Sequence, residues 1–172
     1  MRTRAVTTTE YRRLLRHLPP REALICRIMA DTGLRVSDVL SLRIWQIRRT
    51  MRITEGKTSK TRVVHLSSAT LAAARAYAGD RRPGDRLIHA DRSTVYRTIS
   101  ITARALGMEH VSAHSLRKYF AQKYCKRHGL EATRRELQHR DIMTTILYTT
   151  DYDTLRGILY DANRNDSRNR GT

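Results

Sequence analysis

Apolar residues recur three and four positions apart along the first forty residues, which is the spacing of one face of an α-helix. Thr7 and Glu10 form a capping-box pattern that predicts the start of a first helix, and the proline pair at 19–20 ends it. The same prolines open a second helix, which Gly33 terminates. Ser37 is then predicted to cap a further short helix.

The pattern changes in the middle of the chain to short segments rich in β-branched residues. Residues 52–55 and 62–66 are two such segments, and the basic stretch between them predicts a small antiparallel hairpin. Helical spacing then returns at residues 71–78, 93–106, 113–128, 131–137, 142–149 and 153–162.

These elements predict a mainly α fold with a small antiparallel β-sheet, an α+β class. No internal repeat or interdomain linker interrupts the pattern, so we expect a single domain over residues 1–162. Residues 163–172 are polar, lack an apolar face and are predicted to form a disordered tail.

The charge of the chain indicates a class of binding partner. The 172 residues include 34 Lys and Arg against 16 Asp and Glu, a formal net charge of +18, which favours nucleic acid as the binding partner. No apolar run approaches the length of a membrane span, and no apolar signal core follows the N-terminus, so a cytoplasmic protein is expected. Cys26 and Cys125 are predicted to be buried free thiols.

Three places along the chain could carry phosphate chemistry. Arg35 follows the helix-ending turn, although, taken alone, a surface ion pair with Asp38 is the favoured explanation of this residue. His114 and Arg117 are three apart, so they share a helical face and could contact one phosphate. Lys57 lies in the hairpin connection, where a solvated turn is the plain alternative.

The second half adds a histidine and a tyrosine. His139 precedes Tyr148 by nine residues, and a short helix between them could present the phenol beside the imidazole. A single tyrosine is more often part of the core or surface than a nucleophile. No Cys pair, HExxH motif, carboxylate cluster or glycine-rich phosphate loop occurs, so we expect neither a metal nor a nucleotide cofactor.

Taken in order, four stretches resemble the catalytic domain of tyrosine recombinases and phage integrases: TGLRVSD at 32–38, EGKTSKTRVVHLS at 55–67, AHSLRKYFA at 113–121 and LQHRDIMTTILYT at 137–149. The resemblance implies that family's fold. It also implies a site-specific DNA recombinase, active in DNA integration, that cleaves and rejoins strands through a 3′-phosphotyrosyl intermediate without metal or ATP.

The resemblance also implies roles for individual residues. Arg35 matches the first catalytic arginine, and Asp38 matches the acidic residue that supports it. Lys57 matches the hairpin lysine that protonates the leaving 5′ hydroxyl, with Lys60 as its nearest competitor.

The remaining roles fall in the two C-terminal motifs. His114 and Arg117 match the family's HxxR pair, and His139 matches its second histidine. Tyr148 takes the place of the nucleophile, with Tyr152 as the nearby rival.

The implied partner is double-stranded DNA, bound by a homo-oligomer, expected to be a tetramer, for which residues 153–162 could supply the contact. Only a few residues precede the first helix, so no N-terminal core-binding domain is expected, and the chain reads as an excised domain or a short recombinase of a phage or another mobile element. Three alternatives remain. One is a non-catalytic DNA-binding regulator with this fold, another a type IB topoisomerase-like nicking-closing enzyme. The third, suggested by charge alone, is a basic RNA-binding structural protein.

Overall fold

The computed structural model describes residues 3–56 and 59–150. The predicted helix at 153–162, the tail at 163–172, and both Lys57 and Tyr152 lie outside the described residues. The described elements are α1 (Thr8–His17), α2 (Pro20–Thr32), α3 (Val36–Ser41), the 3-10 helix η1 (Ile44–Gln46), β1 (Thr50–Thr54), β2 (Thr61–His65), α4 (Ser68–Ala78), α5 (Arg92–Ala105), α6 (Ala113–His128), α7 (Leu130–Leu137) and α8 (Ile142–Thr149). The predicted fold class, mainly α with one small antiparallel sheet, is confirmed.

Local capping chemistry decides where several helices begin. The prediction that Ser37 caps α3 is wrong: the cap is Arg35, whose backbone N–H donates to the Asp38 carboxylate at 3.3 Å. Ser67 caps α4 and Asp91 caps α5, so both helices begin slightly earlier than the apolar spacing indicates. A side-chain oxygen satisfies backbone donors at a helix start that periodicity alone does not locate.

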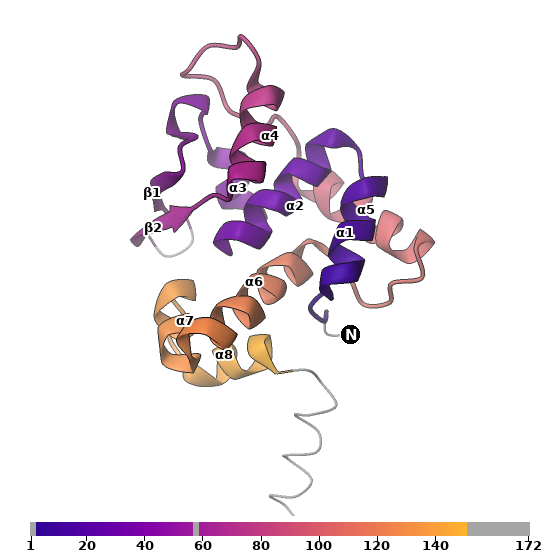
Figure 1. Cartoon of the computed structure of the whole chain (residues 1–172), viewed down its shortest axis with the longest axis vertical. Helices are drawn as coiled ribbons and strands as arrows, with labels where there is room; N and C mark the ends of the chain where they lie inside the picture. The colour runs from indigo at the N-terminus through magenta and orange to yellow at the C-terminus, as the bar shows by residue number, and fades with distance from the viewer. Residues whose placement is uncertain (1–2, 57–58, 151–172) are drawn as a thin grey trace, which may run out of the picture.

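The two strands pair in antiparallel register, with Met51 opposite Val64 and Ile53 opposite Arg62. Burial alternates along both strands, so one face of the hairpin packs inward and the other faces solvent. The hairpin follows α3 and lies at the edge of the helical body (Figure 1).

Helix α2 forms the centre of the molecule, between α4 on one side and α6 on the other (Figure 1). Leu24, Ile25, Ile28 and Met29 of α2 are fully or almost fully buried. Because such side chains are each worth about 1.5–3 kcal/mol when buried, α2 anchors the main core.

Helices α6, α7 and α8 pack on one another and form the orange-to-yellow end of the molecule in Figure 1. Phe120, Ala121 and Leu137 form a second small core here, against which the rings of Tyr124 and Tyr148 pack. The predicted nucleophile therefore rests on an apolar support.

Both cysteines are free, as predicted. Cys26 is fully buried in α2, but Cys125 is only half-buried, so the prediction of two buried thiols is wrong for Cys125. Cys125 lies near the end of α6, past Ala121, the last fully buried residue of that helix.

Gly33 joins the two cores and yields a first testable prediction. Its φ is +67°, and a Cβ added there would lie 2.5 Å from Cδ1 of Phe120. Gly33→Ala therefore combines a left-handed backbone penalty of about 1–2 kcal/mol with overpacking of about 1–3 kcal/mol. Urea denaturation is expected to show that the free energy of unfolding falls by about the sum of these two penalties.

Gly107 provides the matched control for Gly33. Its φ is +72°, but a Cβ there meets nothing within 4 Å. Gly107→Ala should therefore cost only the backbone penalty of about 1–2 kcal/mol. Equal losses for the two variants would contradict the packing argument.

Candidate functional site

Five of the predicted site residues converge from separate elements onto the junction between the two cores. Arg35 comes from the turn between α2 and α3, and His114 and Arg117 come from the first turns of α6. His139 comes from the turn between α7 and α8, and Tyr148 from the end of α8. Residues more than a hundred positions apart thus share one site.

The Tyr148 hydroxyl hydrogen-bonds to Nε2 of His114. The two rings meet edge to face, with centroids 5.1 Å apart. The His139 ring lies on the same phenol, also edge to face, at 4.7 Å. Tyr148 is therefore held between two imidazoles.

Burial and neighbouring cations set the protonation of this group. Burial lowers the pKa of His114 to about 4, and the charges of Arg117, Lys118 and Arg35 act in the same direction. Burial raises the pKa of the Tyr148 phenol, against the opposing effect of Arg117 and Arg35. At neutral pH a protonated phenol therefore faces a neutral imidazole, which has a lone pair free to accept the proton.

A buried hydrogen bond orients His139. Its Nδ1 lies 3.0 Å from Oγ1 of Thr145, and burial, followed by Arg117 and Arg35, lowers its pKa to about 4. Gln138 just before it has a φ of +55° and ends α7 in the left-handed conformation. That turn directs the chain, and His139 with it, back towards α6.

These two histidines predict a pH-dependent stability. An ordinary histidine has a pKa near 6.5, so below about that pH the unfolded chain binds protons that the folded chain, with pKa values of about 4, does not. The free energy of unfolding should therefore fall as the pH is lowered from 7 to 5, which urea titrations can measure. His114→Asn should flatten this dependence, and a free energy that rises towards pH 5 would contradict the assignment.

Asp38 supports the turn that carries Arg35. Its Oδ2 accepts the Arg35 backbone N–H at 3.3 Å and lies 4.0 Å from Nη1 of the same residue. Its Oδ1 accepts the N–H of Gly56 at 3.1 Å. Asp38 is 3% exposed, so the alternative of a surface ion pair is wrong, and the carboxylate instead ties the α3 turn to the end of β1.

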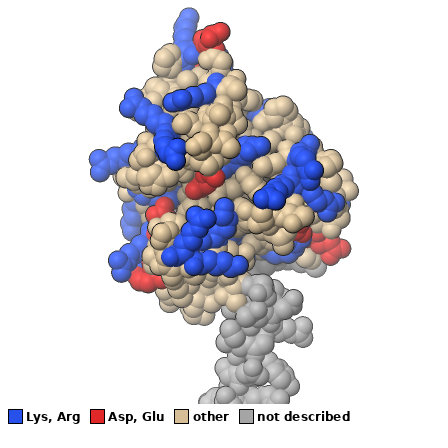
Figure 2. Space-filling view, viewed as in Figure 1, with Lys and Arg blue, Asp and Glu red and all other residues tan. Residues whose placement is uncertain are grey.

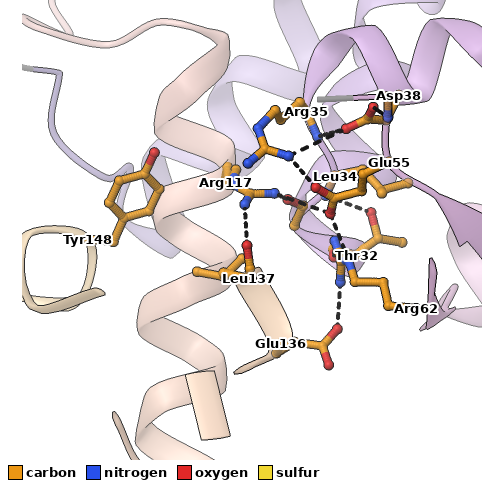
Figure 3. Close-up of polar contacts among 12 residues, drawn as sticks. Thr32, Leu34, Arg35, Asp38, Glu55, Arg62, Arg117, Glu136, Leu137 and Tyr148 are labelled. Atoms are coloured by element: carbon orange, nitrogen blue, oxygen red, sulfur yellow. Dashed lines mark hydrogen bonds and ion pairs between the residues drawn. The ribbon is translucent and has the colours of Figure 1, made fainter. Parts of the chain in front are cut away.

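Glu55 is the main residue of this site that sequence reasoning missed. Its side chain is 0% exposed, and its Oε2 accepts a hydrogen bond from Nη1 of Arg35. Its Oε1 accepts one from Nε of Arg62 at 2.8 Å and lies 3.9 Å from Nη1 of Arg117. Figure 3 shows the carboxylate among these three guanidinium groups.

The strand pattern contained a signal for this cluster. Glu55 continues the buried alternation of Met51 and Ile53, and Arg62 occupies a buried position two before Val64. Charged residues at apolar-facing strand positions are rarely buried without a partner. An acid and a base on the inward face of one hairpin therefore indicate a buried ion pair.

Arg62 extends the cluster towards α7. Its Nη1 lies 2.5 Å from Oε1 of Glu136, and its Nη2 donates to the carbonyl of Thr32 at 2.9 Å. The hairpin is thereby bonded both to α7 and to the end of α2.

Arg117 is the most buried cation of the site, at 1% exposure. It donates to the carbonyl of Gly33 through Nη1 and to that of Leu137 through Nη2, the latter at 2.8 Å. Burial lowers its pKa to about 10, so it stays charged at neutral pH. Arg35 is more accessible, at 24% exposure.

Within the described part of the chain, His, Cys, Asp and Glu side chains form no group of three that could hold a metal ion. None of the helices described here is long and apolar enough to span a bilayer.

Comparison with known proteins assigns the chain to a family. Residues 4–154 match the phage integrase family. The chain belongs to the phage integrase family. Tyrosine recombinase XerA of Saccharolobus solfataricus is 30% identical over 134 residues, which cover 75% of this chain and 45% of that protein. This integrase-family chain thus spans about half the length of the curated relatives it matches.

Solved structures share the integrase fold. A crystal structure of XerA recombinase superposes with a TM-score of 0.72 and 23% identity, covering 95% of this chain and 66% of that one. A lambda integrase tetramer bound to a Holliday junction superposes with a TM-score of 0.71 and 19% identity, covering 88% of this chain and 49% of that one. At these identities the likeness establishes the fold of this family member.

Proposed function

We propose that this chain is the catalytic domain of a site-specific DNA recombinase, with Tyr148 as its nucleophile. The observation that carries the proposal is the hydrogen bond between the Tyr148 hydroxyl and the neutral imidazole of His114, next to Arg35 and Arg117. A phenol paired with a base and flanked by permanent cations is suited to attack on a phosphodiester.

In the proposed reaction the Tyr148 oxygen attacks phosphorus as its proton passes to Nε2 of His114. A bond forms between the phenolic oxygen and phosphorus, and the bond from phosphorus to the 5′ oxygen of the next nucleotide breaks. The 5′ oxygen leaves as a hydroxyl after taking a proton, for which we propose Lys57 as donor. The 3′-phosphotyrosyl bond retains the energy of the broken phosphodiester, so a 5′ hydroxyl can reverse the reaction without ATP.

Negative charge develops on the non-bridging oxygens during attack. Arg35 and Arg117 would stabilise it, since a guanidinium matches two phosphate oxygens and keeps its charge. His139 would add a third donor, because a Thr145 hydroxyl that donates to Nδ1 leaves the ring proton on Nε2. Mutagenesis of comparable oxyanion donors costs about 100- to 1,000-fold in rate.

Charge and relatives support a DNA partner. The net charge is +18, and Figure 2 shows Lys and Arg spread over the face in view, with few Asp and Glu among them. Lambda integrase, which shares the fold, forms a tetramer on a Holliday junction. We therefore propose that this chain acts on duplex DNA as an oligomer, and the role of residues 153–162 in that assembly stays a prediction.

Covalent capture from a random DNA pool tests the proposal and finds the target sequence in the same experiment. The chain is incubated with duplexes that carry randomised sequence around a central nick, so that the short cleaved fragment dissociates and the protein remains attached. We expect an SDS-resistant adduct whose DNA converges on one sequence and whose modified peptide contains Tyr148. Binding to duplexes without any adduct would instead support the non-catalytic DNA-binding alternative.

A further inference from the structure

The Glu55 carboxylate occupies an unusual electrostatic position. It is fully buried, yet its two oxygens contact or approach three guanidinium groups, those of Arg35, Arg62 and Arg117. Two of these three arginines are the proposed phosphate-binding groups. Arg62 is instead paired on its other side with Glu136.

Stability alone is a weak reason for such a cluster. Removing charges from water costs several kcal/mol per ion, and well-packed apolar residues of similar volume often stabilise a protein equally well. A buried carboxylate that hydrogen-bonds to Arg35 and lies 3.9 Å from Arg117, itself bonded to the carbonyls of Gly33 and Leu137, has in addition a geometric use.

We propose that Glu55 is a positioning residue for the reaction, which fixes Arg35 and Arg117 in the arrangement that receives the scissile phosphate. This inference rests on the proposed function. Arg35 has a long, partly exposed side chain, and ordering such a side chain costs conformational entropy. The bond to Glu55 offsets this cost before DNA arrives, which is the general advantage of preorganisation.

The contact leaves donors for the phosphate. Arg35 uses Nη1 towards Glu55, and its Nε and Nη2 make no hydrogen bond to the residues that the structure describes. Arg62 also faces Glu136, and Arg35 also lies 4.0 Å from Asp38, so the charges of the three arginines and three carboxylates balance. The phosphate would therefore be bound through the remaining N–H donors of Arg35 and not through an excess of positive charge in this cluster.

The backbone of Glu55 places the hairpin connection against the same site. Its N–H donates to the carbonyl of Lys60 at 3.0 Å, and its own carbonyl accepts from the N–H of Ser59 at 2.8 Å. The backbone of Glu55 therefore closes the base of the hairpin connection, while its side chain contacts Arg35 and approaches Arg117. Glu55 thus links the hairpin connection to the two arginines.

The test measures the single-turnover rate of adduct formation by Glu55→Gln on the captured nicked duplex. The amide keeps the shape of Glu55 but lacks the charge that orients two guanidinium groups. We expect the rate to fall about 100-fold on the natural phosphodiester, while the dissociation constant for DNA changes less than about threefold.

A second substrate separates positioning from general damage. In a methylphosphonate at the scissile position, a methyl group replaces one non-bridging oxygen and removes the negative charge that Arg35 and Arg117 would meet. If Glu55 acts through those arginines, the rate ratio between wild type and Glu55→Gln should shrink to below about tenfold on this substrate. Equal ratios on both substrates would overturn the inference and leave Glu55 a structural residue.

Glu136→Gln is the matched control, because it removes the other carboxylate on Arg62 without touching Arg35 or Arg117. Its rate should stay within about threefold of wild type. Glu55→Asp retains the charge but withdraws it by one methylene, so it carries the same two-substrate comparison should Glu55→Gln fail to fold. A wild-type rate in Glu55→Gln overturns this inference alone, whereas absence of adduct from the wild-type chain overturns the proposed function and the inference together.

Discussion

Tyr148→Phe is expected to abolish the SDS-resistant protein–DNA adduct while its affinity for the same duplex stays within about twofold of wild type. The substitution removes the oxygen that we propose as the nucleophile, and the phenyl ring that remains cannot form a phosphotyrosyl bond. Removal of a covalent nucleophile typically costs several orders of magnitude in rate. Denaturing gels of the nicked duplex and an equilibrium binding assay measure the two quantities.

Binding and folding should survive because the ring remains. It still packs on the small core of Phe120, Ala121 and Leu137, although the hydroxyl bond to His114 is lost. Tyr124→Phe is the matched control, since the Tyr124 ring packs on the same core and stacks on Phe120 at 5.5 Å. It should form the adduct normally. Persistence of the adduct in Tyr148→Phe would move the nucleophile elsewhere, with Tyr152 as the first residue to test.

Glu55→Ala is expected to produce the largest loss of stability, about 3–5 kcal/mol. The change leaves Arg62 and Arg117 buried, at 7% and 1% exposure, without their shared carboxylate. Because domains of this size are stable by only about 5–15 kcal/mol, a large part of the total would be lost. Chemical denaturation measures this loss, provided that the free energy of unfolding depends on denaturant concentration with the same slope in wild type and variant.

Glu131→Ala removes a carboxylate that also pairs with two arginines, Arg134 and Arg135, but on the surface. Solvent and salt screen such pairs, so its loss should be far smaller than that of Glu55→Ala. Similar losses for the two variants would show that the burial of the Glu55 cluster contributes nothing.

Local chemistry made several site residues predictable. His114 and Arg117 share a helical face because of their spacing, and α6 carries them as predicted. Gly33 ends α2 with a positive φ, so the position of Arg35 just beyond that turn also follows from local sequence. The lysine of the hairpin connection stays a prediction, since Lys57 lies outside the described residues.

Other features depended on contacts between distant segments. The burial of Asp38 and the contacts of Glu55 with Arg35 and Arg117, which are 20 and 62 residues away, have no counterpart in helical or strand periodicity. Periodicity states which face of an element is buried, but it does not state which other element covers that face.

The sequence by itself determined the class of the fold, the order of its elements and the family resemblance, and it supplied the candidates for the reactive groups, because spacing, caps and motifs are local properties of the chain. The tertiary structure alone decided how those groups act together. It placed the Tyr148 hydroxyl on His114 and lowered the pKa of both histidines to about 4 by burying them near cations. Desolvation and charge proximity arise only after distant segments pack, which is why the protonation states and the Glu55 cluster emerge from the fold.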